Sequence, residues 1–102
     1  MNALEKVFSI IQQRAAQPEE GSYTNYLLSK GLDKVLKKVG EEASETIIAA
    51  KNNKKTELIG ELADLQYHLL VLMYVTGVTP EEVNSELEQR FGKGGFHGRT
   101  GK

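Results

Sequence analysis

The chain has 102 residues, a formal net charge of −1 and no cysteine. A chain of this length forms one small domain with a thin core, and the lack of cysteine excludes disulfides, zinc ribbons and cysteine nucleophiles. A near-neutral charge gives no overall field for nucleic acid, so we expect no such partner. The N-terminal residues show no export or import signal, and the apolar run 69–75 is too short to cross a bilayer. We therefore expect a cytoplasmic protein without a membrane segment.

Two helices are expected in the first third of the chain. Asn2 and Glu5 form the pattern of a capping box, which predicts a first helix that stops before Pro18. Ser22 is a suitable N-cap for a short second helix that runs toward Gly31. Both segments show apolar residues at helical spacing, and no alternating strand pattern occurs anywhere in the sequence. The fold class is therefore expected to be all-α.

The middle of the chain predicts two longer helices. The third runs from residue 32 to about 52 and has one apolar stripe with carboxylates beside it. A turn at residues 52–54 precedes a fourth helix, for which Thr56 is the expected cap and Gly77 the expected end. This fourth helix is apolar around nearly its whole circumference and must be buried on several sides. So short a chain cannot surround it alone, and we expect homodimerisation to complete the bundle.

A fifth helix is expected near the C-terminus. Thr79, Pro80 and Glu82 form a clear start signal, with a cap, a proline at the first helical position and a capping box. Beyond this helix the sequence becomes rich in glycine and basic residues, a composition that cannot bury enough surface to fold alone. The expected organisation is one domain over residues 1–91 and a flexible tail over residues 92–102.

Two short groups of carboxylates are the main chemical feature. Glu41, Glu42 and Glu45 project from the third helix within an arc of about 100°, and Glu61 and Asp64 share one face of the fourth. If these helices pack antiparallel, the two groups can meet, and their repulsion raises the carboxyl pKa values unless a hard cation lies between them. The alternative is a set of ordinary solvated surface acids. Against this, two of the acids interrupt the most apolar helix, where an unpaired charge is costly.

Oxygen ligands alone favour magnesium or manganese over zinc or copper. Magnesium commonly binds a few carboxylates together with substrate phosphates, so phosphoanhydride cleavage is the natural reaction. Lys34 and Lys38 precede the acids on the same arc and could meet those phosphates. The alternative is that they form solvated ion pairs at i and i+4, as Lys38 with Glu42 would.

His68 lies four residues after Asp64, on the side of the fourth helix that carries the acids. It either orients a carboxylate or a metal-bound water, or it is a core histidine hydrogen-bonded to Asp64, and we favour the core histidine. Tyr23, Thr24 and Tyr26 could contact a base or ribose, although tyrosines at helical spacing more often pack.

Several motifs together resemble a known family. They are Ser22-Tyr23-Thr24, Leu27-Leu28, Gly31, Lys34, Lys38-Val39-Gly40-Glu41-Glu42-Ala43-x-Glu45 and Glu61-x-Ala63-Asp64-Leu65-x-Tyr67-His68. With them the chain resembles the phosphoribosyl-ATP pyrophosphatases of histidine biosynthesis. That family belongs to the MazG-like all-α NTP pyrophosphatases, whose shared signature is Glu-Glu-x-x-Glu followed by Glu-x-x-Asp. The resemblance extends from the first expected helix to about Phe91 and implies a MazG-like helical bundle.

The resemblance also implies an activity. It is hydrolysis of phosphoribosyl-ATP to phosphoribosyl-AMP and pyrophosphate, by magnesium-assisted attack of water at the α–β phosphoanhydride, with manganese as the alternative metal. By position, the implied metal ligands are Glu42, Glu45, Glu61 and Asp64. The catalytic candidates are Glu41, Glu42 and Glu45, of which Glu41 is an outer residue, a base or a further ligand. The candidates for substrate binding are Lys34, Lys38, Tyr23 and His68.

Two other functions are compatible with the same residues. A house-cleaning pyrophosphatase for non-standard nucleoside triphosphates would share the metal site and differ in the base pocket. A non-catalytic helical dimer that serves as an interaction module would have no use for a metal.

Overall fold

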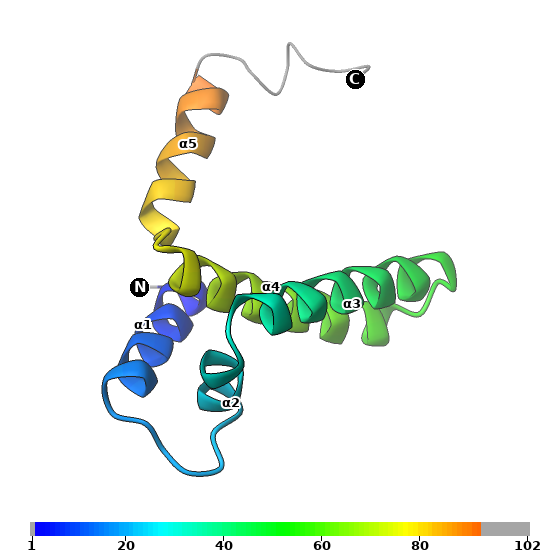
Figure 1. Cartoon of the computed structure of the whole chain (residues 1–102). Helices are drawn as coiled ribbons and strands as arrows, with labels where there is room; N and C mark the ends of the chain where they lie inside the picture. The colour runs from blue at the N-terminus through cyan, green and yellow to red at the C-terminus, as the bar shows by residue number, and fades with distance from the viewer. Residues whose placement is uncertain (1, 93–102) are drawn as a thin grey trace.

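The computed structural model of the chain describes residues 2–92. In this part the chain forms five helices and no strand: α1 (Ala3–Ala16), α2 (Tyr23–Lys30), α3 (Leu32–Lys51), α4 (Lys55–Thr76) and α5 (Pro80–Gly92). The all-α fold with five helices is thus confirmed. Helices α3 and α4 form a long antiparallel pair, α1 and α2 lie at one end of it, and α5 projects away (Figure 1). Gly92 ends α5, and residues 93–102, which belong to the predicted flexible tail, lie outside the described part.

Local capping fixes most of the helix starts. The side chain of Asn2 accepts from the Glu5 amide at 2.9 Å, and the Glu5 carboxylate accepts from the Asn2 amide at 3.1 Å. Thr79 and Glu82 exchange the same two hydrogen bonds, at 3.1 and 2.9 Å. Ser22 caps α2. Each cap satisfies backbone amides that have no partner within the helix, so these three predicted starts are confirmed.

The predicted start of α4 is wrong by two residues. Thr56 lies inside the helix, and Lys54 occupies the N-cap position without a side-chain cap. The reason is the turn that precedes it, where Asn53 adopts a left-handed conformation with φ of 58°. The Lys54 amide then donates to the Ala49 carbonyl at 3.3 Å, which closes the turn before Thr56 is reached. At the other end Gly77 stops α4 with a φ of 81°, as its position predicted.

The core lies at one end of the α3–α4 pair. It contains six buried apolar side chains from four helices: Phe8, Ile11, Leu27, Val35, Leu70 and Val71. Helix α5 contributes none of them. Because α1 and α2 pack only at this end, the rest of the pair depends on the contact between α3 and α4 themselves.

Helix α4 carries more apolar surface than the described chain covers. By length and composition alone this 22-residue helix could cross a membrane, with a mean hydropathy of 1.3 in its most apolar window. The expectation from the sequence considered only the uninterrupted apolar run 69–75, which is too short to cross a bilayer. The mean hydropathy of a longer window also counts the polar residues between apolar ones, so α4 meets the criterion although the run does not. Core helices of soluble proteins meet the same criterion, so the finding is weak evidence for a membrane. Only 17% of that window is buried, and Ile59 on α4 is 58% exposed.

The buried end of the fold generates a first prediction. Ile11 is fully buried, whereas Ile10 beside it on α1 is 45% exposed. Truncation of a buried isoleucine loses its burial and leaves a cavity, so Ile11→Ala should lower the free energy of unfolding by about 2–5 kcal/mol. Urea unfolding followed by circular dichroism measures this loss, and Ile10→Ala is the matched control with a much smaller one. Equal losses in the two variants would contradict the placement of the core.

Candidate functional site

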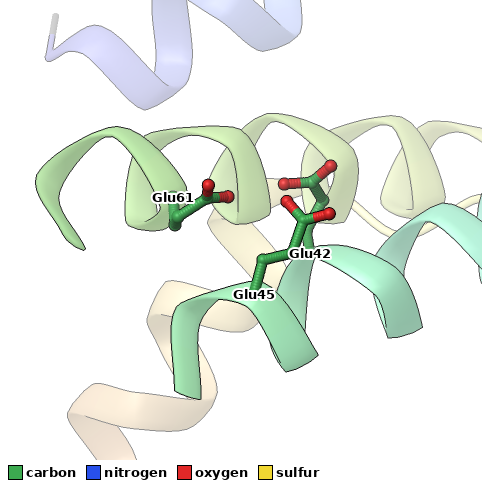
Figure 2. A group of neighbouring side chains, drawn as sticks. All are labelled: Glu42, Glu45 and Glu61. Carbon is green, nitrogen blue, oxygen red and sulfur yellow. The ribbon is translucent and has the colours of Figure 1, made fainter. Parts of the chain in front are cut away.

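Three carboxylates converge between α3 and α4. Glu42 and Glu45 extend from α3 and Glu61 from α4, and one oxygen of each lies within 4.8 Å of the other two. Figure 2 shows the three side chains pointing toward one another across the helix pair. The structure therefore brings together one part of each predicted acidic group. Their convergence follows from antiparallel packing, because the short turn after α3 places these positions side by side.

Two other predicted acids lie outside this trio. Asp64 is exposed and lies nearly one turn beyond Glu61 on α4. The side chain of Glu41 is 44% exposed, and its Oε1 lies 3.3 Å from Lys38 Nζ. Within residues 2–92, the structure thus groups three of the five acids closely and leaves these two at the margin.

Burial makes two of the three carboxylates, those of Glu42 and Glu61, chemically unusual, whereas Glu45 is exposed. Glu42 is only 7% exposed. Within the described part of the chain, the buried Oε1 atoms of Glu42 and Glu61 have no hydrogen-bond partner. Burial raises the pKa of Glu61 to about 7, and the adjacent carboxylates of Glu45 and then Glu42 add to this rise. Buried oxygens without a donor are costly, so the trio favours uptake of either a proton or a cation.

The chemistry of these donors fits a hard divalent cation. All three contribute carboxylate oxygen, which magnesium, manganese and calcium prefer, and none contributes the nitrogen or sulfur typical of zinc or copper sites. A bound cation would remove the repulsion among the carboxylates and supply a partner for both buried oxygens. Glu42, Glu45 and Glu61 are therefore the residues that could hold such an ion.

Lys38 lies at the edge of the trio. Its Nζ is 3.3 Å from Glu41 Oε1 and 3.9 Å from Glu42 Oε2. The hydrogen bond to Glu41 raises the pKa of Lys38 and keeps the ammonium charged. The structure thus shows the ion pairs expected as the alternative, and it also places a positive charge beside the carboxylates.

Lys34 contacts an aromatic ring. Its Nζ lies 5.7 Å from the centroid of the Tyr26 ring on α2. None of the ion pairs found in residues 2–92 includes it. Lys34 and Lys38 therefore share one side of α3 but contact different groups.

His68 is a buried histidine with both ring nitrogens engaged. Its Nδ1 lies 2.8 Å from the backbone carbonyl oxygen of Asp64, and its Nε2 lies 2.9 Å from the Tyr23 hydroxyl. A carbonyl can only accept, so Nδ1 carries a proton, and in the neutral ring Nε2 accepts from the hydroxyl. The partner is thus the backbone of Asp64, whose carboxylate is left available. Burial raises the pKa of Tyr23, which keeps its hydroxyl protonated as this donor.

Two further contacts of α2, made by Thr24 and Lys30, were not predicted from the sequence. Thr24 is buried, and its hydroxyl hydrogen-bonds to that of Tyr67. Burial raises the pKa of Tyr67 as well. The Nζ of Lys30 lies 5.7 Å from the centroid of the Tyr26 ring. The spacing of Tyr26 and Lys30 at i and i+4 was the available signal.

Comparison with known proteins identifies relatives along nearly the whole chain. A match to the family Phosphoribosyl-ATP pyrophosphohydrolase covers residues 4–91. The phosphoribosyl-ATP pyrophosphatase of Streptococcus thermophilus is 56% identical over 90 residues, which are 88% of this chain and 86% of that protein. The protein of the same name from Listeria welshimeri is 58% identical with the same coverage. That from Lactiplantibacillus plantarum is 53% identical over 93 residues, 91% of this chain and 88% of the relative.

The raised pKa of Glu61 predicts a pH dependence of the metal-free protein. Its pKa rises from an ordinary 4.5 to about 7, so the folded chain holds this proton more tightly than the unfolded chain. The resulting stabilisation is complete below the unfolded pKa and is lost as the pH rises through the folded one. Urea unfolding in EDTA between about pH 5 and pH 8.5 should show this loss.

Glu61→Gln should make that profile flatter, because it removes the titrating group. Glu57→Gln, at an exposed acid on the same helix, is the matched control and should retain the wild-type slope. An unchanged slope in Glu61→Gln would show that another group causes the pH dependence.

Proposed function

The chain belongs to the phosphoribosyl-ATP pyrophosphohydrolase family, and on this premise we propose that it hydrolyses phosphoribosyl-ATP to phosphoribosyl-AMP and pyrophosphate in histidine biosynthesis. The observation that carries this proposal is the trio of Glu42, Glu45 and Glu61, in which one buried oxygen of Glu42 and one of Glu61 have no hydrogen-bond partner among the described residues. A polyphosphate substrate brings its own cations and anionic oxygens to such a site. The function assigned to the relatives and the chemistry of the trio therefore agree.

Magnesium is the proposed cofactor, with manganese as its alternative. Glu42, Glu45 and Glu61 would hold it, and Asp64 is the proposed fourth ligand because it follows on the same helix with a free carboxylate. When bound, the metal offsets the phosphate charge and polarises the scissile phosphoanhydride. The trio alone would otherwise repel a triphosphate, so the cation is needed for binding as well as for reaction.

Residues of the chain have separate roles in the proposed reaction. Water forms a new bond to one phosphorus atom of the α–β phosphoanhydride, and the bond from that phosphorus to the bridging oxygen breaks. A base has to accept the proton that the attacking water loses. Glu41, Glu42 and Glu45 are the proposed catalytic residues. Glu41 is the candidate proton acceptor, because it lies next to the trio without belonging to it. Lys38, beside both Glu41 and Glu42, can donate to a phosphate oxygen.

Tyr23 and His68 are proposed to act on the substrate side of the site. Tyr23 is 44% exposed, and its hydroxyl is held by the buried His68. His68 has no nitrogen left for a ligand, so its proposed role is to position Tyr23. A tyrosine ring held in this way presents a rigid apolar face with a polar edge.

We also propose that two copies of the chain form a homodimer in the cytoplasm. The outer part of the α3–α4 pair exposes large apolar side chains on both helices, among them Ile47, Ile48, Ile59 and Leu62. Single exposed apolar residues need no explanation, but four large ones at the same end of one helix pair favour an interface. A second copy would bury this surface by isologous contact.

The activity is tested by pyrophosphate release. Wild-type protein should release pyrophosphate from phosphoribosyl-ATP, and Glu45→Gln should reduce this rate at least about 100-fold. Mutation of residues that only hydrogen-bond a metal ligand already lowers metal affinity or activity by about 10- to 100-fold. Glu88→Gln, an exposed acid on α5, is the matched control and should remain active. A panel of dNTPs assayed in parallel identifies the substrate. Turnover of dNTPs alone would replace the proposal by a house-cleaning pyrophosphatase.

Magnesium linkage separates an enzyme from a non-catalytic helical module. Magnesium at about 100 times its Kd should raise the free energy of unfolding of the wild type by about 2.7 kcal/mol. Glu45→Gln should lose most of this gain, as measured by urea unfolding with and without magnesium. No stabilisation of the wild type, together with no pyrophosphate release, would leave the interaction module as the better description.

The dimer is tested by sedimentation. Wild-type protein should sediment as a dimer at micromolar concentration, and Ile59→Glu should shift it toward monomer because a charge then has to be buried. Ile10→Glu on α1 is the control at a site of similar exposure away from the pair. A monomeric wild type with unchanged helix content would contradict the proposal.

A further inference from the structure

A second charged group lies at the junction of α2 and α3. The Nζ atoms of Lys30 and Lys34 each lie 5.7 Å from the centroid of the Tyr26 ring. Lys30 ends α2 and Lys34 lies in the first turn of α3. Gly31, with a φ of 90°, turns the chain between them. Two like charges are thus held over one aromatic ring.

Neither ammonium group pairs with a carboxylate among the described residues. The two lysines repel each other, and their contacts with the ring are weaker than charge-assisted hydrogen bonds to an anion. An anion that reaches both would therefore replace the ring contacts with stronger ones.

The Tyr26 ring is itself held in place. It stacks on Tyr23 with a centroid distance of 6.0 Å and an interplanar angle of 24°. Tyr23 in turn is hydrogen-bonded to the buried His68 of α4. A series of contacts therefore connects the core to the ring near which both ammonium groups lie.

The distance along α3 separates this group from the carboxylates. Lys34 precedes Glu42 by eight residues, which corresponds to about 12 Å of helix rise. Lys38 lies between them and pairs with Glu42. Lys38 is thus the lysine that can contact a phosphate bound at the carboxylates, whereas Lys30 and Lys34 lie farther toward the N-terminus of α3. Lys38, together with a cation held by the carboxylates, attracts an anion at one point, and Lys30 with Lys34 attracts one at another. These two points fit a ligand that carries negative charge at two separate ends.

Phosphoribosyl-ATP has this character. Its triphosphate is on one ribose, and a single phosphate is on the second ribose at the other side of the purine. ATP carries only the triphosphate. We propose that Tyr26, Lys30 and Lys34 form a second phosphate site, which binds the monophosphate of the phosphoribosyl group and selects this substrate against ATP. The proposal rests on the proposed function of the chain.

The role proposed here for Lys34 differs from the one expected from the sequence. There Lys34 was grouped with Lys38 as a contact of the metal-bound phosphates. The structure separates the two, since Lys38 pairs with the acids and Lys34 lies over Tyr26. A phosphate monoester carries nearly two negative charges at neutral pH, which two lysines can match.

The test is a kinetic comparison of the double variant Lys30→Gln/Lys34→Gln with wild type. The KM for phosphoribosyl-ATP should rise at least about tenfold, since two charge-assisted contacts are lost. The kcat should change little, because the scissile bond is remote. The Ki of ATP as a competitive inhibitor should stay the same, because ATP lacks the second phosphate. Lys30→Arg/Lys34→Arg should keep most of the affinity, and circular dichroism verifies that each variant is folded.

Lys37→Gln is the matched control, since it removes one exposed charge from the same helix away from the Tyr26 contacts. An equal rise of KM in this control would mean that general positive charge, not the proposed site, holds the substrate. An equal rise in the Ki of ATP would assign the lysines to the triphosphate and overturn the proposal. An unchanged KM in the double variant would also overturn it while leaving the proposed function intact. A wild type that does not hydrolyse phosphoribosyl-ATP would instead refute the proposed function, and the second site with it.

Discussion

Repulsion among three carboxylates is the constraint on which this structure depends. Glu42, Glu45 and Glu61 are held within 4.8 Å of one another in a partly buried position, where none of the described side chains supplies a cation to all three. This repulsion lowers the stability of the fold, but the helix pair remains folded because its stability comes from the other end, where the core joins α1 and α2 to α3 and α4. Separation of the two regions allows a site that is unfavourable without a ligand to persist in a small fold.

The sequence was sufficient for features set by short-range chemistry. The capping boxes at Asn2 and Thr79 depend on residues three positions apart, and both form. The meeting of the acids was predictable too, because helical periodicity and a short turn leave few ways to arrange α3 and α4. Thr56 shows the limit of the approach. A suitable cap residue was present, but Asn53 could adopt a left-handed conformation and complete the turn earlier.

Features that depend on how α2 packs were not predictable. The hydrogen bond between Tyr23 and His68 joins residues 45 positions apart, and it exists only because α2 lies against α4. The same packing decides that Lys34 contacts Tyr26, although its helical position would equally have allowed a contact with the acids. Periodicity gives the side of a helix on which a residue lies. It does not say which neighbouring helix covers that side.

Helix α3 thus presents two different electrostatic environments along one side. Near its middle, the converging carboxylates favour a cation, and Lys38 marks the edge of that region. Toward its N-terminus, Lys34, which lies near Lys30 at the end of α2, has no carboxylate partner among the described residues and favours an anion. Because a helix is rigid over three turns, the spacing between these regions is fixed by the fold and not by side-chain adjustment. A substrate that engages only one region loses the contribution of the other, so selectivity can arise from the length of the ligand as much as from its base.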